Sequence, residues 1–149
     1  MSAFVTAGAG FLLAVLWFDL MFDVQALGAR ARALPEERLA SISAYYARVT
    51  TAARPMNRLI AAVMIATIAA IVVEIADGGA PRWAGWVSLA LAAIPIVLAG
   101  GRTVPSAVRL GSRRDAPEEQ SALARSICRE HVLCFASIAA LIALQLAAV

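Results

Sequence analysis

The sequence has little charge and few of the residues that usually build catalytic or metal centres. Only 15% of its 149 residues are charged, whereas 62% are hydrophobic, and it contains one histidine, two cysteines and no lysine. Soluble domains average about 25% charged and about 45–50% apolar residues. The composition therefore excludes an ordinary soluble domain, and we expect a single integral membrane domain over residues 1–149.

The two cysteines exclude a disulfide framework and a CxxC redox motif. Cys128 and Cys134 are six residues apart, so on one helix they lie on different faces and cannot pair with each other. His131 with either cysteine could form half of a metal site, and Asp19 and Asp23 would bring the set to three or four ligands, but a lone histidine without a CxxC or HxxxH spacing is a weak metal signal. We therefore expect no metal and no cofactor. The 13 basic residues, all arginine, lie beside the apolar segments, so nucleic acid is not an expected partner.

Four apolar segments are long enough to cross a bilayer. A helix rises about 1.5 Å per residue, so about 20 residues span a hydrocarbon core of about 30 Å. The sequence therefore predicts an all-α four-helix transmembrane bundle that has the lipid bilayer as a partner. The predicted spans cover residues 4–27, 56–76, 83–101 and 131–149.

Arginine is distributed unevenly between the connections that join these spans. Only Arg82 lies in the short turn between spans two and three, and the other twelve lie in or beside the two long connections. Cytoplasmic connections carry an excess of basic residues, so we expect a bacterial-type inner membrane protein with both termini outside. The twelve are Arg30, Arg32, Arg38, Arg48, Arg54, Arg58, Arg102, Arg109, Arg113, Arg114, Arg125 and Arg129.

Both long connections are expected to form amphipathic helical elbows on the cytoplasmic side. In the first, Leu39, Ile42 and Tyr46 recur at three- and four-residue steps after a helix start at Pro35. In the second, the helix that begins at Pro117 has no breaker before the end of the chain, which predicts one rod of about 50 Å. The connections also resemble each other, which favours either a parallel internal repeat or convergence of two helix starts on similar residues.

Span one carries two carboxylates, Asp19 and Asp23, inside its apolar run. They are four residues apart, so they lie on the same face of a helix. An ionisable side chain at membrane depth is costly, and it therefore marks a candidate functional site. Counting residues along the spans places polar groups from all four in one layer at the cytoplasmic leaflet. The expected ligand-binding residues are Asp19, Asp23, Asn57, Arg58, Arg102, Glu130 and His131.

The two carboxylates also have structural interpretations. Asp19 could form an ion pair with Arg102 or Arg58, which would neutralise it within the membrane. Asp23, one turn closer to the membrane surface, could be a solvated carboxylate at the interface. These interpretations stay open beside the functional ones.

Two further pairs of residues are assigned to the membrane boundary. Tyr45 and Tyr46 are expected to anchor the first elbow at the interface, where amphipathic rings are favoured. Arg125 and Arg129 are one turn apart and face one way, so we expect them to bind lipid headgroups.

Three functional hypotheses fit the polar layer. The first is a protein that binds or moves a small lipophilic ligand or a cation, with Asp19 as the central carboxylate. The second is an enzyme acting on a lipophilic or aromatic substrate, with His131 as base and Asp19 orienting it, which requires a cavity beside His131. The third is a non-catalytic subunit or lipid-binding scaffold, which would form a homo-oligomer or join a larger membrane complex.

One set of residues follows the layout of a known family. The set comprises Tyr45 or Tyr46 in the elbow, Asn57 in span two, Pro105 after span three, and Arg125 and His131 leading into span four. This layout resembles the anthrone-oxygenase-like family of small four-helix integral membrane proteins. The resemblance implies cofactor-free oxidation of a polycyclic aromatic or a related small-molecule task. The asparagine of the family just beyond the third-span proline is replaced by the run Ser106–Val108.

Overall fold

The computed structural model describes residues 2–28, 32–79 and 81–148, and every regular element within them is a helix. Arg30, which contributes to the predicted orientation, and Val149, the predicted end of span four, lie outside the described residues. The longer helices are α1 (Ser2–Asp23), α3 (Arg54–Ala76), α4 (Arg82–Leu98) and α6 (Pro117–Ala147), and the shorter ones are α2 (Glu36–Ala47) and α5 (Val104–Ser112).

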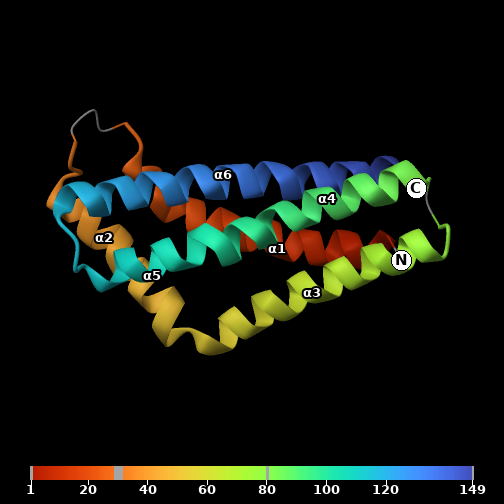
Figure 1. Ribbon diagram of the computed structural model, residues 1–149, viewed down its shortest axis with the longest axis horizontal. Coiled ribbons are helices and arrows are strands. Elements are labelled where there is room, and N and C mark those ends of the chain that lie inside the picture. Colours follow the sequence, from red (N-terminus) through yellow and green to blue (C-terminus); the bar gives the residue numbers. More distant parts are fainter. Residues whose placement is uncertain (1, 29–31, 80, 149) are drawn as a thin grey trace.

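The four longer helices form a closed bundle, because α1 and α4 each pack against both α3 and α6. Figure 1 shows α1, α4 and α6 running close to parallel, whereas α3 diverges from them toward the end of the bundle that carries α2. We call this end the elbow end. The start of α1 and the end of α6 lie together at the opposite end (Figure 1). This placement agrees with an even number of spans, and the orientation in a membrane stays a prediction.

Four helical segments of the described chain are long and apolar enough to cross a membrane, so the predicted all-α bundle of four spans is confirmed. The first two segments agree with the predicted spans to within one residue. The predicted rod is also present, since α6 has 31 residues and is therefore about 46 Å long. The four segments are Ala3–Ala26, Pro55–Ala76, Arg82–Ser112 and Pro117–Ala147.

The helix that carries span three runs past its expected end at residue 101. It continues through a π-turn, η3 (Ala99–Thr103), into α5. Pro95 removes one hydrogen bond within α4. Four residues later the helix takes up one extra residue in the π-turn and continues instead of ending. The Thr103 hydroxyl oxygen lies 3.2 Å from the carbonyl oxygen of Leu98 at the widened turn, and its single proton is shared with the Glu130 carboxylate, which is closer at 2.7 Å.

The two halves of the chain do not correspond helix for helix. α1 ends in a short 3-10 turn, η1 (Val24–Ala26), whereas α4 continues into α5. A second π-turn, η2 (Arg48–Ala52), and a break at Ala53 separate α2 from α3, but α6 runs without a break from the elbow into its span. The differences favour convergence of two helix starts over a parallel repeat.

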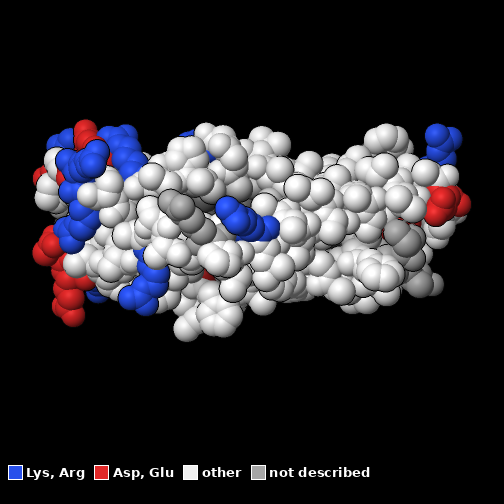
Figure 2. All heavy atoms as spheres, turned by 90° about the horizontal axis from the view of Figure 1, so that it is seen from below, with Lys and Arg blue, Asp and Glu red and all other residues white. Residues whose placement is uncertain are grey.

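The surface of the bundle is apolar between two charged ends. In the view of Figure 2, acidic and basic side chains gather at the two ends of the long axis, and the middle is mostly uncharged. Each long helix also exposes a large apolar side chain, and Trp17, Ile65, Val97 and Leu146 are at least 59% exposed. Apolar surface of this extent is unfavourable in water, so we expect lipid to cover it.

The first elbow folds back on the bundle and builds a core at the elbow end. Leu39, Ile42 and Tyr46, the stripe predicted from the sequence, are all at most 2% exposed. They pack with Leu110 of α5 and Ile127 of α6 in one apolar cluster. The amphipathic stripe of the first elbow is therefore present as predicted.

Gly111 allows α2 to lie directly on α5. A Cβ atom at Gly111 would be 2.7 Å from the backbone nitrogen of Ala47 and 2.9 Å from its Cα. Since backbone atoms cannot rotate away, we expect Gly111→Ala to lower the free energy of unfolding by about 1–3 kcal/mol, the usual cost of overpacking. Denaturant unfolding of the purified protein in detergent micelles, followed by tryptophan fluorescence, measures this loss.

Gly10→Ala in α1 is the matched control. No atom lies within 4 Å of a Cβ at Gly10, so this change gains helix propensity without a clash, and a stabilisation of about 0.5–1 kcal/mol is expected. Equal stability of the two variants would show that α2 does not touch α5 at Gly111.

Candidate functional site

A buried carboxylate, Asp23, joins three helices at the elbow end. It is the last residue of α1 and is fully buried. Its Oδ1 accepts a hydrogen bond from the Tyr46 hydroxyl of α2 at 2.5 Å, and its Oδ2 lies 2.6 Å from Nδ1 of His131 on α6. A carboxylate can only accept, so the proton of the second bond is on Nδ1. The interpretation of Asp23 as a solvated carboxylate is therefore wrong.

The second carboxylate of α1, Asp19, bonds to the residue that precedes Tyr46. The Tyr45 hydroxyl donates to Asp19 Oδ1 at 2.6 Å. The Tyr45 ring stacks on Phe22 with centroids 4.1 Å apart and meets Tyr46 edge-on. Two carboxylates one turn apart on α1 are thus matched to two successive tyrosines of α2. Both tyrosines, expected as interfacial anchors, donate hydrogen bonds to these two carboxylates.

The environment keeps both tyrosines in their neutral form. Burial raises the pKa of Tyr46 well above its ordinary value of 10.0, and the negative charge of Asp23 raises it further. The pKa of Tyr45 is raised in the same way, first by burial and then by the charge of Asp19. Because a phenolate beside a carboxylate is unfavourable, both hydroxyls stay protonated at neutral pH and donate to the carboxylates.

Glu130 forms a separate polar group beside His131. Its Oε2 accepts the Thr103 hydroxyl at 2.7 Å, and its Oε1 accepts the Ser126 hydroxyl at 3.1 Å. Arg102 reaches the same carboxylate at 3.5 Å. The Arg102 side chain is 69% exposed, so this ion pair adds little stability.

The predicted ion pair of Asp19 with Arg102 or Arg58 is not present among the described residues. Arg102 lies in the π-turn η3, from which it reaches Glu130 on α6 instead. Arg58 is exposed on α3. The partner of Asp19 is an uncharged phenol.

A cavity of about 500 Å³ lies between α3 and the other helices, next to Asp19. Most of its wall is apolar, with Leu12 and Phe18 from α1, Met64 from α3 and Ile138 from α6 among the residues that border it. The lining contains no arginine among the described residues. The polar residues that border it are Asp19, Tyr45, Tyr46, Thr50, Asn57, Thr103 and His131.

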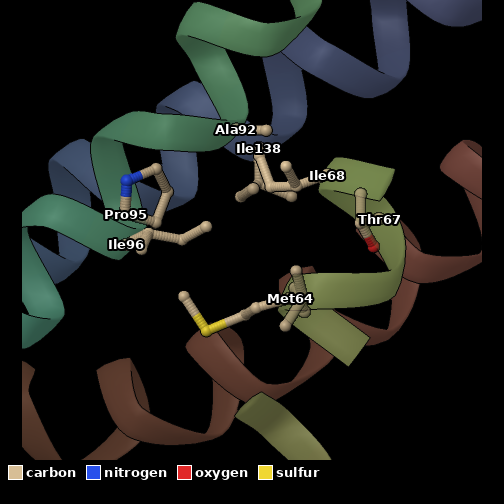
Figure 3. Close-up of a pocket in the computed structure, with 8 residues that line it drawn as sticks. Met64, Thr67, Ile68, Ala92, Pro95, Ile96 and Ile138 are labelled. Atoms are coloured by element: carbon tan, nitrogen blue, oxygen red, sulfur yellow. The ribbon is translucent and has the colours of Figure 1, made fainter. Parts of the chain in front are cut away.

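The cavity leads into a smaller apolar pocket between α3 and α4. Leu12, Met64, Pro95 and Ile138 border both. Figure 3 shows Met64 on the α3 side and Pro95 and Ile96 on the α4 side of this pocket. A bound molecule would therefore meet polar groups at the elbow end of the cavity and, beyond Met64, apolar side chains with Thr67 as the one polar exception among the described residues.

His131 is held by Asp23 and also borders the cavity. The bond from Nδ1 to Asp23 fixes the plane of the imidazole ring, and Tyr46 Oη lies farther from Nδ1, at 3.4 Å. In the described part of the chain, Nε2 has no hydrogen-bond partner. This ring nitrogen is the acceptor through which His131 can bind a ligand or take a proton.

The remaining predicted residues have local roles. Asn57 Nδ2 donates to the carbonyl oxygen of Val49 at 2.7 Å, which joins α3 to the preceding π-turn. Arg125 Nη1 donates to the carbonyl oxygen of Arg32 at 3.1 Å, and Arg129 Nε donates to that of Arg125 at 3.3 Å. Headgroup binding by Arg125 and Arg129 stays a prediction.

Within the described ranges, no three His, Cys, Asp or Glu side chains are close enough to hold a metal ion. Cys128 and Cys134 are both buried, free thiols. Thr103 and the pairing of the tyrosines with the carboxylates are the parts of the site that the sequence did not predict. The position of Tyr46 on the buried stripe of α2 was the only signal that it faces inward.

Comparison of the chain with protein-family models, with curated proteins and with solved structures gives no match.

Proposed function

We propose that this membrane protein binds a small lipophilic molecule in the cavity and holds the polar group of that molecule against Asp19, Tyr45 and His131. The observation that carries the proposal is the cavity of about 500 Å³, apolar along most of its wall, with these three polar side chains among those that border it. Pockets of about 300–1,000 Å³ with a few well-placed polar groups are typical of small-molecule sites.

The mouth of the cavity favours a ligand that comes from the bilayer. Phe18, Met56 and Val104 border the cavity and are also exposed on the outside of the bundle. All three lie in segments apolar enough to span a membrane. A lipophilic molecule could therefore enter sideways from the hydrocarbon without crossing water. The arginine distribution supports an entrance from the cytoplasmic leaflet of a bacterial-type inner membrane.

Binding fits the cavity better than conduction along the bundle. The smaller pocket into which the cavity leads is bordered almost entirely by apolar side chains, with Thr67 as the exception. The Thr67 hydroxyl donates to the carbonyl oxygen of Val63 within its own helix. A continuous polar path, which an ion would need, is not supported.

Photolabelling tests the proposal. The probe is a decanol that carries a diazirine in its chain, added to the full protein in lipid nanodiscs. Irradiation is expected to label residues inside the cavity, such as Met64 and Ile138, as mapped by peptide mass spectrometry. Val15→Trp puts an indole into the cavity wall, so labelling of Met64 is expected to fall about tenfold, which corresponds to about 1.4 kcal/mol of binding free energy.

Val97→Trp is the control for this variant. Val97 is 70% exposed and is not among the residues that border the cavity, so the same substitution there is expected to leave labelling of Met64 unchanged. Labelling of the exposed residue Leu133 corrects for probe dissolved in the lipid. Equal labelling of Met64 in the two variants would contradict the proposal.

Oxidation of an aromatic substrate is a second candidate function, favoured by the geometry of His131. A general base needs a ring nitrogen that faces the substrate and a partner that orients the ring. Asp23, and not Asp19 as expected from the sequence, provides the orientation, and Nε2 is the nitrogen left for a substrate. Tyr45, Tyr46 and Asn57, which take part in the resemblance to the anthrone-oxygenase-like family, also border the cavity.

A further inference from the structure

The charge around Asp19 indicates which polar group a ligand of this cavity would carry. Asp19 uses one carboxylate oxygen, Oδ1, to accept the Tyr45 hydroxyl. Within the described chain, its Oδ2 has no partner, and Asp19 borders the cavity. Asp23, in contrast, uses both oxygens, one for Tyr46 and one for His131. Asp19 is therefore the carboxylate with an acceptor to offer a ligand.

Within the described chain, no arginine forms an ion pair with Asp19. His131, the one basic side chain among the described residues that border the cavity, bonds directly to Asp23 and acts on Asp19 only through space. Arg102, the arginine predicted to pair with Asp19, bonds to Glu130 instead. A carboxylate in an apolar environment is costly when no cation bonds to it directly. A positively charged ligand group would remove this cost, and an anionic one would increase it.

The apolar wall defines the rest of the ligand. From Asp19 the cavity extends past Leu16 and Leu12 on the same helix to Met64 and Ile138. Leu16 and Leu12 are about one and two helical turns before Asp19, so this wall is about 10 Å long. An unbranched alkyl chain of about eight to ten carbons matches that length.

From these observations we propose that the ligand is a lipophilic amine, whose ammonium group binds the free oxygen of Asp19 and whose alkyl or aromatic body lies along Leu12, Met64 and Ile138. The proposal rests on the proposed function, because it assigns the ligand class of the same cavity. A charge-assisted hydrogen bond is about twice as strong as a neutral one, and it supplies the discrimination between an amine and a neutral analogue of the same shape.

Two diazirine probes that differ only in their head group test this proposal. The full protein in nanodiscs of uncharged lipid is irradiated with diazirine-bearing decylamine or with the corresponding decanol, and labelling of Met64 is divided by that of the exposed residue Leu133. In the wild type this ratio is expected to be about tenfold higher for the amine than for the alcohol, as a difference of about 1.4 kcal/mol predicts. Asp19→Asn is expected to remove the preference while labelling by the alcohol persists.

Each outcome decides one question. Equal ratios for the two probes in the wild type overturn the amine proposal even if the variant does not fold, and they leave the proposed function standing. An amine preference that persists in a folded Asp19→Asn protein also overturns it. Absence of Met64 labelling by both probes overturns the proposed function and the amine proposal together. Asp77→Asn, a change at an exposed carboxylate at the end of α3, is the control and is expected to keep the wild-type preference.

Discussion

Replacement of Asp23 with alanine is expected to lower the free energy of unfolding by about 3–5 kcal/mol, because two buried hydrogen bonds to a carboxylate are lost and their donors are left without an acceptor. Asp23 is fully buried and accepts hydrogen bonds from Tyr46 and His131. Without the carboxylate, both donors would remain in the core with no acceptor in its place. Denaturant unfolding in detergent micelles, followed by circular dichroism, measures the loss.

Two further variants separate the causes of this loss. Asp23→Asn keeps an oxygen for Tyr46 and offers an amide N–H to Nδ1 of His131 once that histidine moves its proton to Nε2. The expected loss is about 1 kcal/mol, since the hydrogen bonds survive and the charge does not. Asp77→Ala, at an exposed aspartate, is the control and is expected to change little. A loss of similar size in Asp23→Ala and Asp77→Ala would mean that Asp23 does not join the helices.

Replacement of His131 with glutamine tests the enzymatic candidate. If His131 takes a proton from the substrate, the rate is expected to fall by about 10²–10⁴-fold, while labelling of the cavity by the decanol probe persists. The substrate to use is anthrone in proteoliposomes under air, where one O₂ converts one anthrone to anthraquinone and water. Oxygen uptake and the absorbance of anthraquinone give the rate.

Protein-free liposomes and the Asp77→Asn protein are the controls for this measurement, since anthrone also oxidises without a catalyst. The wild type and Asp77→Asn are expected to be equally fast and faster than lipid alone. A wild-type rate equal to that of lipid alone, or an unchanged rate in His131→Gln, would contradict the enzymatic candidate and leave ligand binding as the proposed function.

The sequence predicted the parts of the fold that depend on hydrophobicity along the chain. The apolar runs located all four spans, and the spacing of Leu39, Ile42 and Tyr46 predicted the buried stripe of α2. The absence of a breaker after Pro117 predicted the single long helix α6. These predictions succeed because burial against lipid or core depends on the apolar content of each helix and on the spacing of its apolar residues, and both can be read from the sequence of that helix alone.

The partners within the polar layer could not be predicted in the same way. Depth counting placed Asp19 and His131 in one layer, but it does not give the rotation of each helix about its axis. Arg102 was one of two arginines that could have paired with Asp19, whereas the π-turn that carries Arg102 directs it to Glu130. The pairing of the carboxylates with Tyr45 and Tyr46 depends on how the elbow folds back, which neither charge nor hydropathy encodes.

The π-turn η3 also has a geometric consequence for the long helix that contains it. A helix turns by about 100° per residue, so the extra residue in η3 shifts the phase of α5 by about that angle relative to α4. With this shift, Ala107 and Leu110 are buried at the elbow end, and Gly111 meets Ala47 of α2. One continuous rod can thus present one face to the membrane bundle and a different face to the elbow.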